Sequence, residues 1–302
     1  MTTETPTPRA LKSWAWATRP FSLTASIVPV LVGSALAMTV TGIDWLLFAL
    51  ALMGSVAIQI GTNLTDEYTD HRRHADKGKF LAPHKVIQRG VLSADAVRFG
   101  MLVAFGIGAG SGLSIVAQVG WPILAVGLGS IGVAYFYSAG PRPIGDAGLG
   151  EVTVFVFMGP LMAVSAYYVQ AREVTVEAIL VSLPVALLVT AILHCNNLRD
   201  ADEDRLSGKR TLARALGPLR GRQLYAALLA AAYTAVAAAV ATGVVSAWAL
   251  LALGPLPWAA GAVRMLWRAD ARPAMNALMV RTAALHWWTG LALAVGLAVS
   301  SA

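Results

Sequence analysis

The sequence predicts an all-α membrane protein that crosses the bilayer nine times, as one domain covering residues 1–302. Two observations lead to this fold class. Only 13% of the residues are charged and 57% are apolar, whereas a soluble domain has about 25% charged residues. The apolar residues also occur in blocks of about 20, the length of a helix that crosses a bilayer. These observations exclude a soluble enzyme and a disordered chain, and the single Cys195 excludes an internal disulfide.

Each block of sufficient length is interpreted as one membrane-spanning helix. The nine predicted spans are 21–40, 45–62, 99–119, 121–138, 152–169, 176–195, 224–244, 247–267 and 279–299. The first contains Ala35-Leu36-Ala37, which resembles a signal-peptidase site, but its apolar run continues to Val40 and indicates a membrane helix. Very short connections follow the first, third and seventh spans. Long polar connections, 65–98 and 196–222, follow the second and sixth, and we expect them to cap the bundle.

The positive charges predict the orientation of the bundle. With the exception of Arg172, every Lys and Arg is predicted to lie on the side of the membrane that holds the N-terminus. Lys and Arg concentrate on cytoplasmic loops. The N-terminus is therefore expected inside and Ala302 outside, in a multi-pass protein of the cytoplasmic (inner) membrane. The net charge of +7 then reflects this orientation and contact with membrane lipids, so no nucleic-acid partner is expected.

The acidic residues form two clusters of identical spacing. Asn63, Asp66 and Asp70 follow the second span, and the pattern Asn-x-x-Asp-x-x-x-Asp returns after the sixth span. The second copy consists of Asn197, Asp200 and Asp204. Residues i, i+3 and i+7 share one face of a helix, so each copy projects an amide and two carboxylates together. An even number of crossings separates the copies, which places both on the same side of the membrane.

Such clusters need a positive partner, because like charges repel at helical spacing. Mg²⁺ binds carboxylates together with substrate phosphates, and two facing clusters suit a metal-bridged diphosphate in a two-metal arrangement. The alternative is that these are solvated loop charges paired with nearby Lys and Arg. Two clusters of equal spacing and matching topology favour the metal site.

Basic residues that follow each cluster are candidates to bind the diphosphate. Lys209 and Arg210 lie directly after the second cluster, and cations near a diphosphate neutralise the charge that grows as it departs. The weaker candidates after the first cluster are Arg72, Arg73, Lys77 and Lys79. Contact with lipid headgroups is the alternative for all of them.

Some residues inside the spans have structural interpretations. His194 and Cys195 end the sixth span and are expected to pack in the core, with a role in lining the site as the other possibility. His286 lies in the ninth span, where a structural hydrogen bond is predicted and a contact with a tail-binding groove is the alternative. Two glycine pairs predict one close-packed helix face: Gly106-x-x-x-Gly110 and Gly108-x-x-x-Gly112.

The chain resembles the UbiA superfamily of intramembrane prenyltransferases, and within it the 1,4-dihydroxy-2-naphthoate polyprenyltransferases of menaquinone synthesis. The segments that resemble the family are Asn196-Asn197-Leu198-Arg199-Asp200 to Asp204, Gly208-Lys209-Arg210-Thr211-Leu212-Ala213, Tyr137 with Gly140-Pro141-Arg142-Pro143, Gly148-Leu149-Gly150-Glu151, and Arg19-Pro20. The resemblance covers nearly the whole chain.

This resemblance implies a site and a reaction. The implied Mg²⁺ ligands are Asn63, Asp66, Glu67, Asp70, Asn197, Asp200 and Asp204, and the implied diphosphate contacts are Lys209, Arg210, Arg142 and Tyr137. A polyprenyl diphosphate would ionise there to an allylic cation, which an aromatic acceptor captures. With dihydroxynaphthoate, carbon dioxide is then lost.

The chain departs from the family pattern in two places. Asp66 and Glu67 stand where the family usually has Asn-Asp, and Asp146 stands where it usually has an aromatic residue. These departures leave open another aromatic acceptor or a terpene cyclase. A transporter is less favoured, because transporters place ionisable groups near the bilayer midplane and here they lie at one face.

Overall fold

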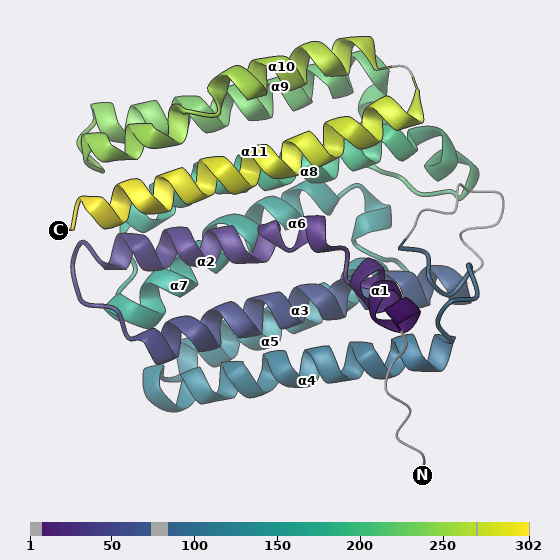
Figure 1. The fold of residues 1–302 in the computed structure, drawn as a ribbon, viewed down its shortest axis with the longest axis horizontal. Helices are drawn as coiled ribbons and strands as arrows, with labels where there is room; N and C mark the ends of the chain where they lie inside the picture. Colours follow the sequence, from purple (N-terminus) through teal and green to yellow (C-terminus); the bar gives the residue numbers. More distant parts are fainter. Residues whose placement is uncertain (1–7, 74–83, 270, 302) are drawn as a thin grey trace.

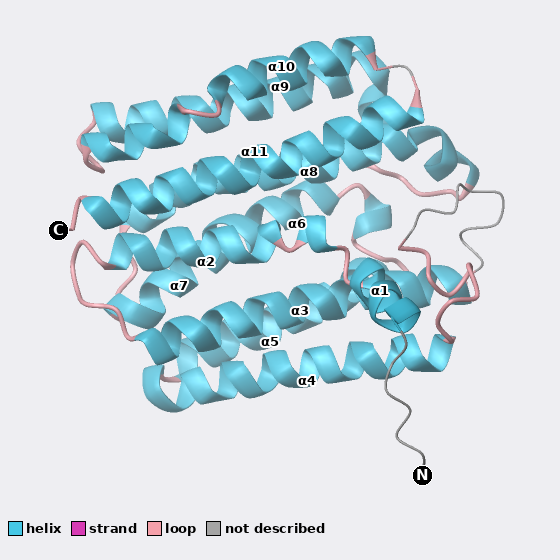
Figure 2. Ribbon diagram, viewed as in Figure 1, coloured by secondary structure: helices cyan, strands magenta, loops and turns pink. Residues whose placement is uncertain are grey.

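The computed structural model describes residues 8–73, 84–269 and 271–301. In this part of the chain all regular structure is helical and no strand occurs (Figure 2). The helices run as follows: α1 Pro8–Ala17, η1 Pro20–Ser22, α2 Thr24–Ala37, α3 Trp45–Arg72, α4 Ala94–Val119, α5 Trp121–Ser138, η2 Gly145–Ala147, α6 Gly150–Val156, η3 Phe157–Leu161, α7 Met162–Ala171, α8 Val176–Leu206, α9 Leu212–Ala241, η4 Ala247–Leu253, α10 Leu256–Arg268 and α11 Arg272–Val299.

The prediction of nine spans is confirmed, because nine helical segments of the described chain are long and apolar enough to cross a membrane. Some of these segments are interrupted. The fifth runs from α6 through η3, a turn of π-helix that contains Gly159 and Pro160, into α7. The eighth joins the 3₁₀-helix η4 to α10. The chain is therefore a multi-pass membrane protein.

The predicted span boundaries are too short at the end of the bundle that carries the acidic clusters. α3 continues to Arg72 and α8 to Leu206, while α9 already begins at Leu212. The connection predicted over 196–222 is thus mostly helix, and only 207–211 lies outside one. Apolar residues mark where a helix lies in lipid, but a helix extends into water as long as its backbone hydrogen bonds continue.

Polar side chains fix where three of the spans begin. Asp44 accepts a hydrogen bond from the Leu47 amide at the start of α3, and Ser93 accepts one from Ala96 before α4. Thr175 caps α8 in the same way. Each cap satisfies a backbone N–H that has no partner within its helix, and so defines where that helix begins.

The bundle has two flanks joined by α2 and α7 (Figure 1). α3, α4 and α5 form one flank, and α8, α9, α10 and α11 form the other. α2 packs against α7 and α11 at very short range. A Cβ added to Gly33 would lie 2.0 Å from the Ala163 carbonyl oxygen, and one added to Gly290 would lie 2.1 Å from Val28. Glycine is required at both positions for the helices to approach this closely.

The predicted close-packed glycine face on α4 is largely wrong. Only Gly108 has a near neighbour, since its Cβ would lie 2.8 Å from Ile58 on α3. The space beside Gly106, Gly110 and Gly112 is open. The small-residue spacing is therefore present in the sequence, but a partner helix covers only one of its positions.

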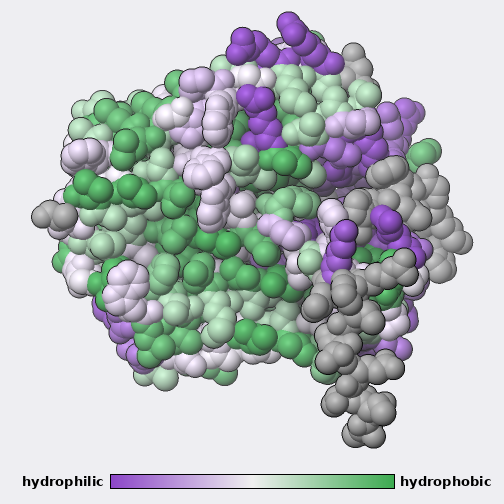
Figure 3. Space-filling model, viewed as in Figure 1, coloured by the Kyte–Doolittle hydropathy of each residue, from purple (hydrophilic) through white to green (hydrophobic). Residues whose placement is uncertain are grey.

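Hydrophobic side chains cover much of the face of the bundle that is seen in Figure 3. Large apolar residues such as Phe99, Trp121 and Leu128 are exposed, as expected for contact with lipid tails. Hydrophilic residues gather toward one end (Figure 3). We call this the polar end and define it by the last turns of α3 and α8. α1 lies at the polar end, whereas the end of α11 lies opposite (Figure 1).

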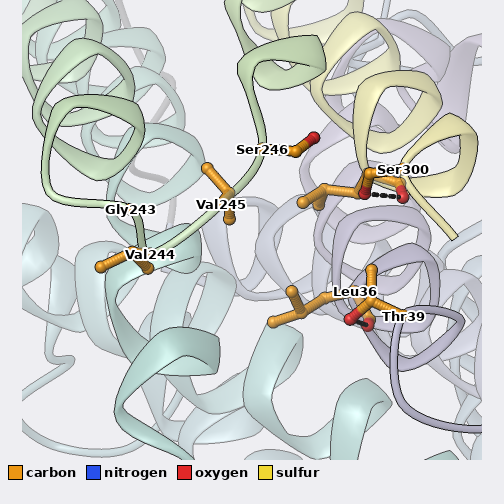
Figure 4. Close-up of a pocket in the computed structure, with 8 residues that line it drawn as sticks. Leu36, Thr39, Gly243, Val244, Val245, Ser246 and Ser300 are labelled. Carbon is orange, nitrogen blue, oxygen red and sulfur yellow. Dashed lines mark hydrogen bonds between the residues drawn. The ribbon is translucent and has the colours of Figure 1, made fainter.

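Two features of the bundle interior lie apart from the acidic clusters. A cavity of about 410 Å³ lies at the end opposite to the polar end, lined by Leu36, Thr39, Ser246 and Ser300 among others (Figure 4). It contains no ionisable side chain and is unsuited to bind a diphosphate. His286 is fully buried, but neither ring nitrogen has a hydrogen-bond partner in the described residues, so the predicted hydrogen bond is wrong.

Candidate active site

The first acidic cluster occupies the last turns of α3, with Asn63 held in a fixed orientation. Its side-chain amide nitrogen donates to the Thr18 carbonyl at 2.8 Å and to the Ser22 hydroxyl at 2.9 Å. Its oxygen is 3.4 Å from the Gln59 amide nitrogen. The segment before α2 therefore determines which end of the amide faces the acidic residues.

The two aspartates of this cluster meet cations from distant parts of the chain. Arg19 donates to Asp66 at 2.5 Å, and Ser138 at the end of α5 donates to the other oxygen of Asp66 at 3.1 Å. Lys85 donates to Asp70 at 2.6 Å. Charge-assisted hydrogen bonds of this kind are among the stronger ones in proteins. Arg19 and Lys85 thus supply the positive charge that the sequence showed to be needed.

Glu67 is placed differently from its neighbours. It is 1% exposed, and its Oε1 accepts a hydrogen bond from the Ile87 amide at 2.9 Å. It lies beside the apolar cluster that includes Leu64 and Val86. The carboxylate predicted as a metal ligand therefore fastens the segment after residue 84 to α3.

The second acidic cluster occupies the last turns of α8. The Asn197 amide nitrogen donates to Glu151 Oε1 on α6 at 3.0 Å. Asp200 binds two guanidinium groups, from Arg199 at 2.6 Å and from Arg272, the first residue of α11, at 2.7 Å. Both oxygens of Asp200 are thus occupied by cations.

Lys209 connects the two clusters. Its ammonium group lies 3.4 Å from Asp146. Burial lowers the pKa of Lys209, but the carboxylates of Asp70, Asp66, Asp146 and Asp204 outweigh burial and raise this pKa above its usual value. Carboxylates of both clusters therefore act on one lysine. The two clusters lie at the same end of the bundle, as the even number of crossings between them predicts, and Asp146 contacts both Arg73 and Lys209, the cations that follow them.

Asp146 lies on the connection between α5 and α6, which packs against the start of α9. Its carboxylate is 3.5 Å from Arg73, and its carbonyl oxygen accepts from the Arg210 amide at 2.8 Å. The adjacent Gly148 has φ +80°, and a Cβ there would lie 2.9 Å from the Arg210 carbonyl oxygen. The glycine allows the two connections to approach, which places Asp146 among the candidate diphosphate residues.

The remaining predicted diphosphate contacts lie around this junction. The Tyr137 hydroxyl lies over the start of α6, since a Cβ on Gly150 would lie 3.1 Å from it. The side chains of Arg142 and Arg210 are exposed, as is that of Arg72. Among the weaker candidates Arg73 contacts Asp146. Lys77 and Lys79 lie outside the described residues.

His84 also lies at the polar end, between the clusters. Burial lowers the pKa of His84 to about 2, and the positive charges of Arg19 and Lys85 act in the same direction. The imidazole is therefore neutral at physiological pH.

Several polar residues of the site were not among the predicted contacts: Arg19, His84, Lys85, Asp146, Glu151, His194 and Arg272. Arg19 and Glu151 lay in segments that resemble the family, and Asp146 marked a departure from the family pattern; these were the available signals. Lys85 and Arg272 are distant in sequence from their partners, and no spacing rule connects them. His194 was expected to pack in the core, but it bonds Glu151 at 2.9 Å.

The donor set suits a hard cation that also binds phosphate. It consists of carboxylate and amide oxygens, the ligands that Mg²⁺ prefers. Within the described residues, however, no three acidic, histidine or cysteine side chains converge on one point. Arg19, Lys85 and Lys209 stand between the carboxylates instead. The arrangement fits a metal that takes few ligands from the protein and the rest from a diphosphate.

Comparison with known proteins identifies the family. The UbiA prenyltransferase family matches residues 26–290. This chain belongs to that family. It is 34% identical to the 1,4-dihydroxy-2-naphthoate octaprenyltransferase of Bacillus subtilis, over 94% of this chain and 91% of the relative. It is 32% identical to the Escherichia coli protein of the same name, over 96% of each. The UbiA family member described here is accordingly a prenyltransferase.

Solved structures of UbiA homologues share its fold. The apo structure of a homologue from Aeropyrum pernix K1 superimposes with a TM-score of 0.70, covering 90% of this chain and 97% of that one at 16% identity. A homologue from Archaeoglobus fulgidus bound to GPP and Mg²⁺ gives a TM-score of 0.62, covering 93% and 99% at 16% identity.

Proposed function

We propose that the protein transfers a polyprenyl group from a polyprenyl diphosphate to 1,4-dihydroxy-2-naphthoate, with loss of diphosphate and carbon dioxide, to form demethylmenaquinol. The observation that carries the proposal is that Asp146 contacts both Arg73, which follows the first acidic cluster, and Lys209, which follows the second. The relatives from Bacillus subtilis and Escherichia coli, both named as octaprenyltransferases acting on this acceptor, support the same reaction.

The diphosphate of the donor is proposed to bind between the clusters. Mg²⁺, as two ions in the arrangement inferred from the sequence, would be held by Asn63, Asp66, Asp70, Asn197 and Asp204. Asp200 supports the site through its ion pairs, and Glu67 supports it through its hydrogen bond to Ile87. The structure of the Archaeoglobus fulgidus homologue bound to GPP and Mg²⁺ supports this proposal. When bound, the metal supplies positive charge to the departing diphosphate.

The protein's own cations act on the same charge. Lys209, with Arg19 and Lys85, lies within reach of carboxylates that the metal would neutralise, so these side chains become free to contact phosphate oxygens. Arg210, Arg142 and Tyr137 complete the proposed contacts. Fixed positive groups stabilise negative charge as it develops on the leaving group.

The acceptor ring captures the allylic cation from within the bundle. The isoprenoid tail and the ring are both largely apolar and match the interior of the helices. Exclusion of water is necessary, because water would consume the cation. The segment after residue 84, held by Glu67, and the connection that carries Asp146 close the polar end above the reacting atoms.

The polar end is proposed to face the cytoplasm, with the end of α11 outside, in the cytoplasmic (inner) membrane. The distribution of Lys and Arg supports this orientation. The diphosphate headgroup of the donor and the charged naphthoate would then reach the site from the cytoplasmic face of the membrane.

A second candidate acceptor is favoured by Asp146. Its carboxylate lies beside Lys209 and Arg73, where the family pattern has an aromatic side chain. Another aromatic acceptor would follow if this carboxylate repels the naphthoate. We expect Asp146→Phe to change the KM for dihydroxynaphthoate by a larger factor than the KM of the donor. Equal changes in both constants would contradict a role in acceptor choice.

Incubation of the purified protein in lipid nanodiscs with Mg²⁺, labelled geranylgeranyl diphosphate and dihydroxynaphthoate tests the main proposal. Prenylated naphthoquinol and carbon dioxide are expected, in equal amounts with diphosphate. Release of diphosphate with only a cyclic hydrocarbon would favour the cyclase. The double variant Asp200→Ala, Asp204→Ala is the control; turnover that persists in it would contradict the assigned site.

A further inference from the structure

Three buried polar side chains meet between α6, α8 and α9. Glu151 is 4% exposed, His194 0% and Asn197 8%. Glu151 Oε1 lies 2.9 Å from His194 Nδ1 and 3.0 Å from the Asn197 amide nitrogen. The other ring nitrogen, Nε2, lies 3.0 Å from the carbonyl oxygen of Gly221. The contacts form a single chain from the α9 backbone to the second acidic cluster.

The hydrogen bond at the Gly221 end of this series of contacts determines the orientation of Asn197. A carbonyl oxygen only accepts, so His194 Nε2 carries a hydrogen atom. One further proton then lies between Nδ1 and Glu151 Oε1, and whichever of the two holds it, Oε1 can still accept from Asn197. Asn197 must present its NH₂ group to Glu151, and its carbonyl oxygen lies on the opposite side of the planar amide.

The first cluster orients its asparagine in the same sense by different means. The NH₂ group of Asn63 donates to the Thr18 carbonyl and the Ser22 hydroxyl. In both clusters, then, the donor end of the amide is bound by the protein frame, although the frame is built from unrelated groups. Both amides are therefore held in one orientation, and the oxygen of Asn63 has only the longer contact of 3.4 Å with Gln59 Nε2.

A purely structural role explains the hydrogen bonds among Glu151, His194 and Asn197 poorly. Apolar contacts among Ala25, Val154 and Val189 already pack α6 against α2 and α8. Burial of a carboxyl group and an imidazole costs free energy that apolar residues would not. In the described residues Glu151 Oε2 is buried without a hydrogen-bond partner, which adds to this cost.

We propose that Glu151 and His194 are positioning residues that hold the Asn197 amide with its oxygen toward the metal and the diphosphate. This inference rests on the proposed function, because it assumes that a Mg²⁺–diphosphate complex binds at the acidic clusters. Partners that orient a metal ligand typically change metal affinity 10–100-fold when they are replaced.

A double-mutant cycle on the full-length protein tests the inference without using turnover. The measurement is calorimetric binding of geranyl thiodiphosphate, a poorly reactive donor analogue, at increasing Mg²⁺ and without acceptor. In Glu151→Gln the new NH₂ group is expected to donate to His194 Nδ1, so it can no longer accept from Asn197. The Mg²⁺ concentration for half-maximal binding is therefore expected to rise roughly tenfold. Asn197→Ala is expected to do the same, and the double variant is expected to show no further shift.

Tyr233→Phe serves as the matched control. It removes a buried hydrogen bond between α9 and α11, that of Tyr233 to Thr289 at 3.0 Å, far from the clusters, and is expected to leave the Mg²⁺ dependence unchanged. If Glu151→Gln does not fold, His194→Gln provides the same test, because it interrupts the series of hydrogen bonds one residue further from Asn197.

The outcomes separate the two proposals. Normal binding by the unmodified protein, with shifts that multiply in the double variant, would overturn the positioning role alone. An unchanged Mg²⁺ dependence in folded Glu151→Gln would overturn it as well. Binding that needs no Mg²⁺ in the unmodified protein would overturn the proposed function and this inference together.

Discussion

The two acidic clusters have the same sequence spacing but different surroundings. At the end of α3, Asp66 and Asp70 each bind one cation from another segment, Arg19 and Lys85. At the end of α8, Asp200 binds two guanidinium groups, one of them from its own helix. Equal spacing therefore gives equal projection from a helix, whereas the charge balance at each cluster is set by the tertiary structure.

Lys209 is the group that the two clusters share, so its removal should have the largest effect. Lys209→Ala is expected to lower kcat roughly 100- to 1000-fold, the usual cost of losing one group that stabilises a developing negative charge. Arg205→Ala is the matched control, because that cation is exposed near the end of α8 and is not among the proposed diphosphate contacts. Measurement of diphosphate release would show the difference; similar losses in both variants would contradict the shared role.

The different charge balance predicts unequal roles for Asp70 and Asp200. Asp70→Asn is expected to reduce kcat/KM for the donor roughly 100-fold, because Asp70 has a single lysine partner and is open to ligate a metal. Asp200→Asn is expected to reduce kcat/KM for the donor roughly tenfold, as for a residue that orients metal ligands without binding the metal itself. Steady-state kinetics at saturating Mg²⁺ checks this, and a larger loss in Asp200→Asn would reverse the comparison.

His84 sharpens the comparison through its pH dependence. Its pKa is about 2 in the folded protein, against 6.5 ordinarily. Below pH 6.5 the unfolded chain therefore binds a proton that the folded chain does not, and the free energy of unfolding falls as the pH decreases. Thermal unfolding at pH 7.5 and 5.5 should show that His84→Gln loses less stability than the unmodified protein. An equal difference in unfolding temperature between His84→Gln and the unmodified protein at both pH values would contradict this assignment.

Glu67 gives the smallest expected effect on catalysis. Because its carboxylate binds the Ile87 amide, Glu67→Gln should retain that hydrogen bond and leave the Mg²⁺ requirement within about twofold, a difference of under 1 kcal/mol. Glu67→Ala leaves the amide without its partner and should destabilise the fold by about 1–3 kcal/mol. Thermal unfolding and Mg²⁺ titration together decide; a strong rise in the Mg²⁺ requirement of Glu67→Gln would restore it as a ligand.

Much of this site was predictable from the sequence. Apolar block length predicted the nine spans, and helical spacing predicted that Asn63, Asp66 and Asp70 share a face. Lys209 was predicted from its place after the second cluster. The partners of these residues were not predictable, because Lys85 reaches Asp70 through a loop and Arg272 reaches Asp200 from another span. Glu67 differs from Asp66 by one position, and only the packing of Val86 and Ile87 shows that it turns into an apolar cluster.

The position of Arg272 has a consequence for biogenesis. This residue begins α11, which is synthesised after both acidic clusters, and it binds both Asp200 and Glu203 near the end of α8. A chain whose synthesis has stopped before α11 carries both acidic clusters but leaves these two carboxylates without the arginine. We expect such nascent or truncated chains to be inactive, so that the reactive cation is generated only in molecules in which α11 has been inserted.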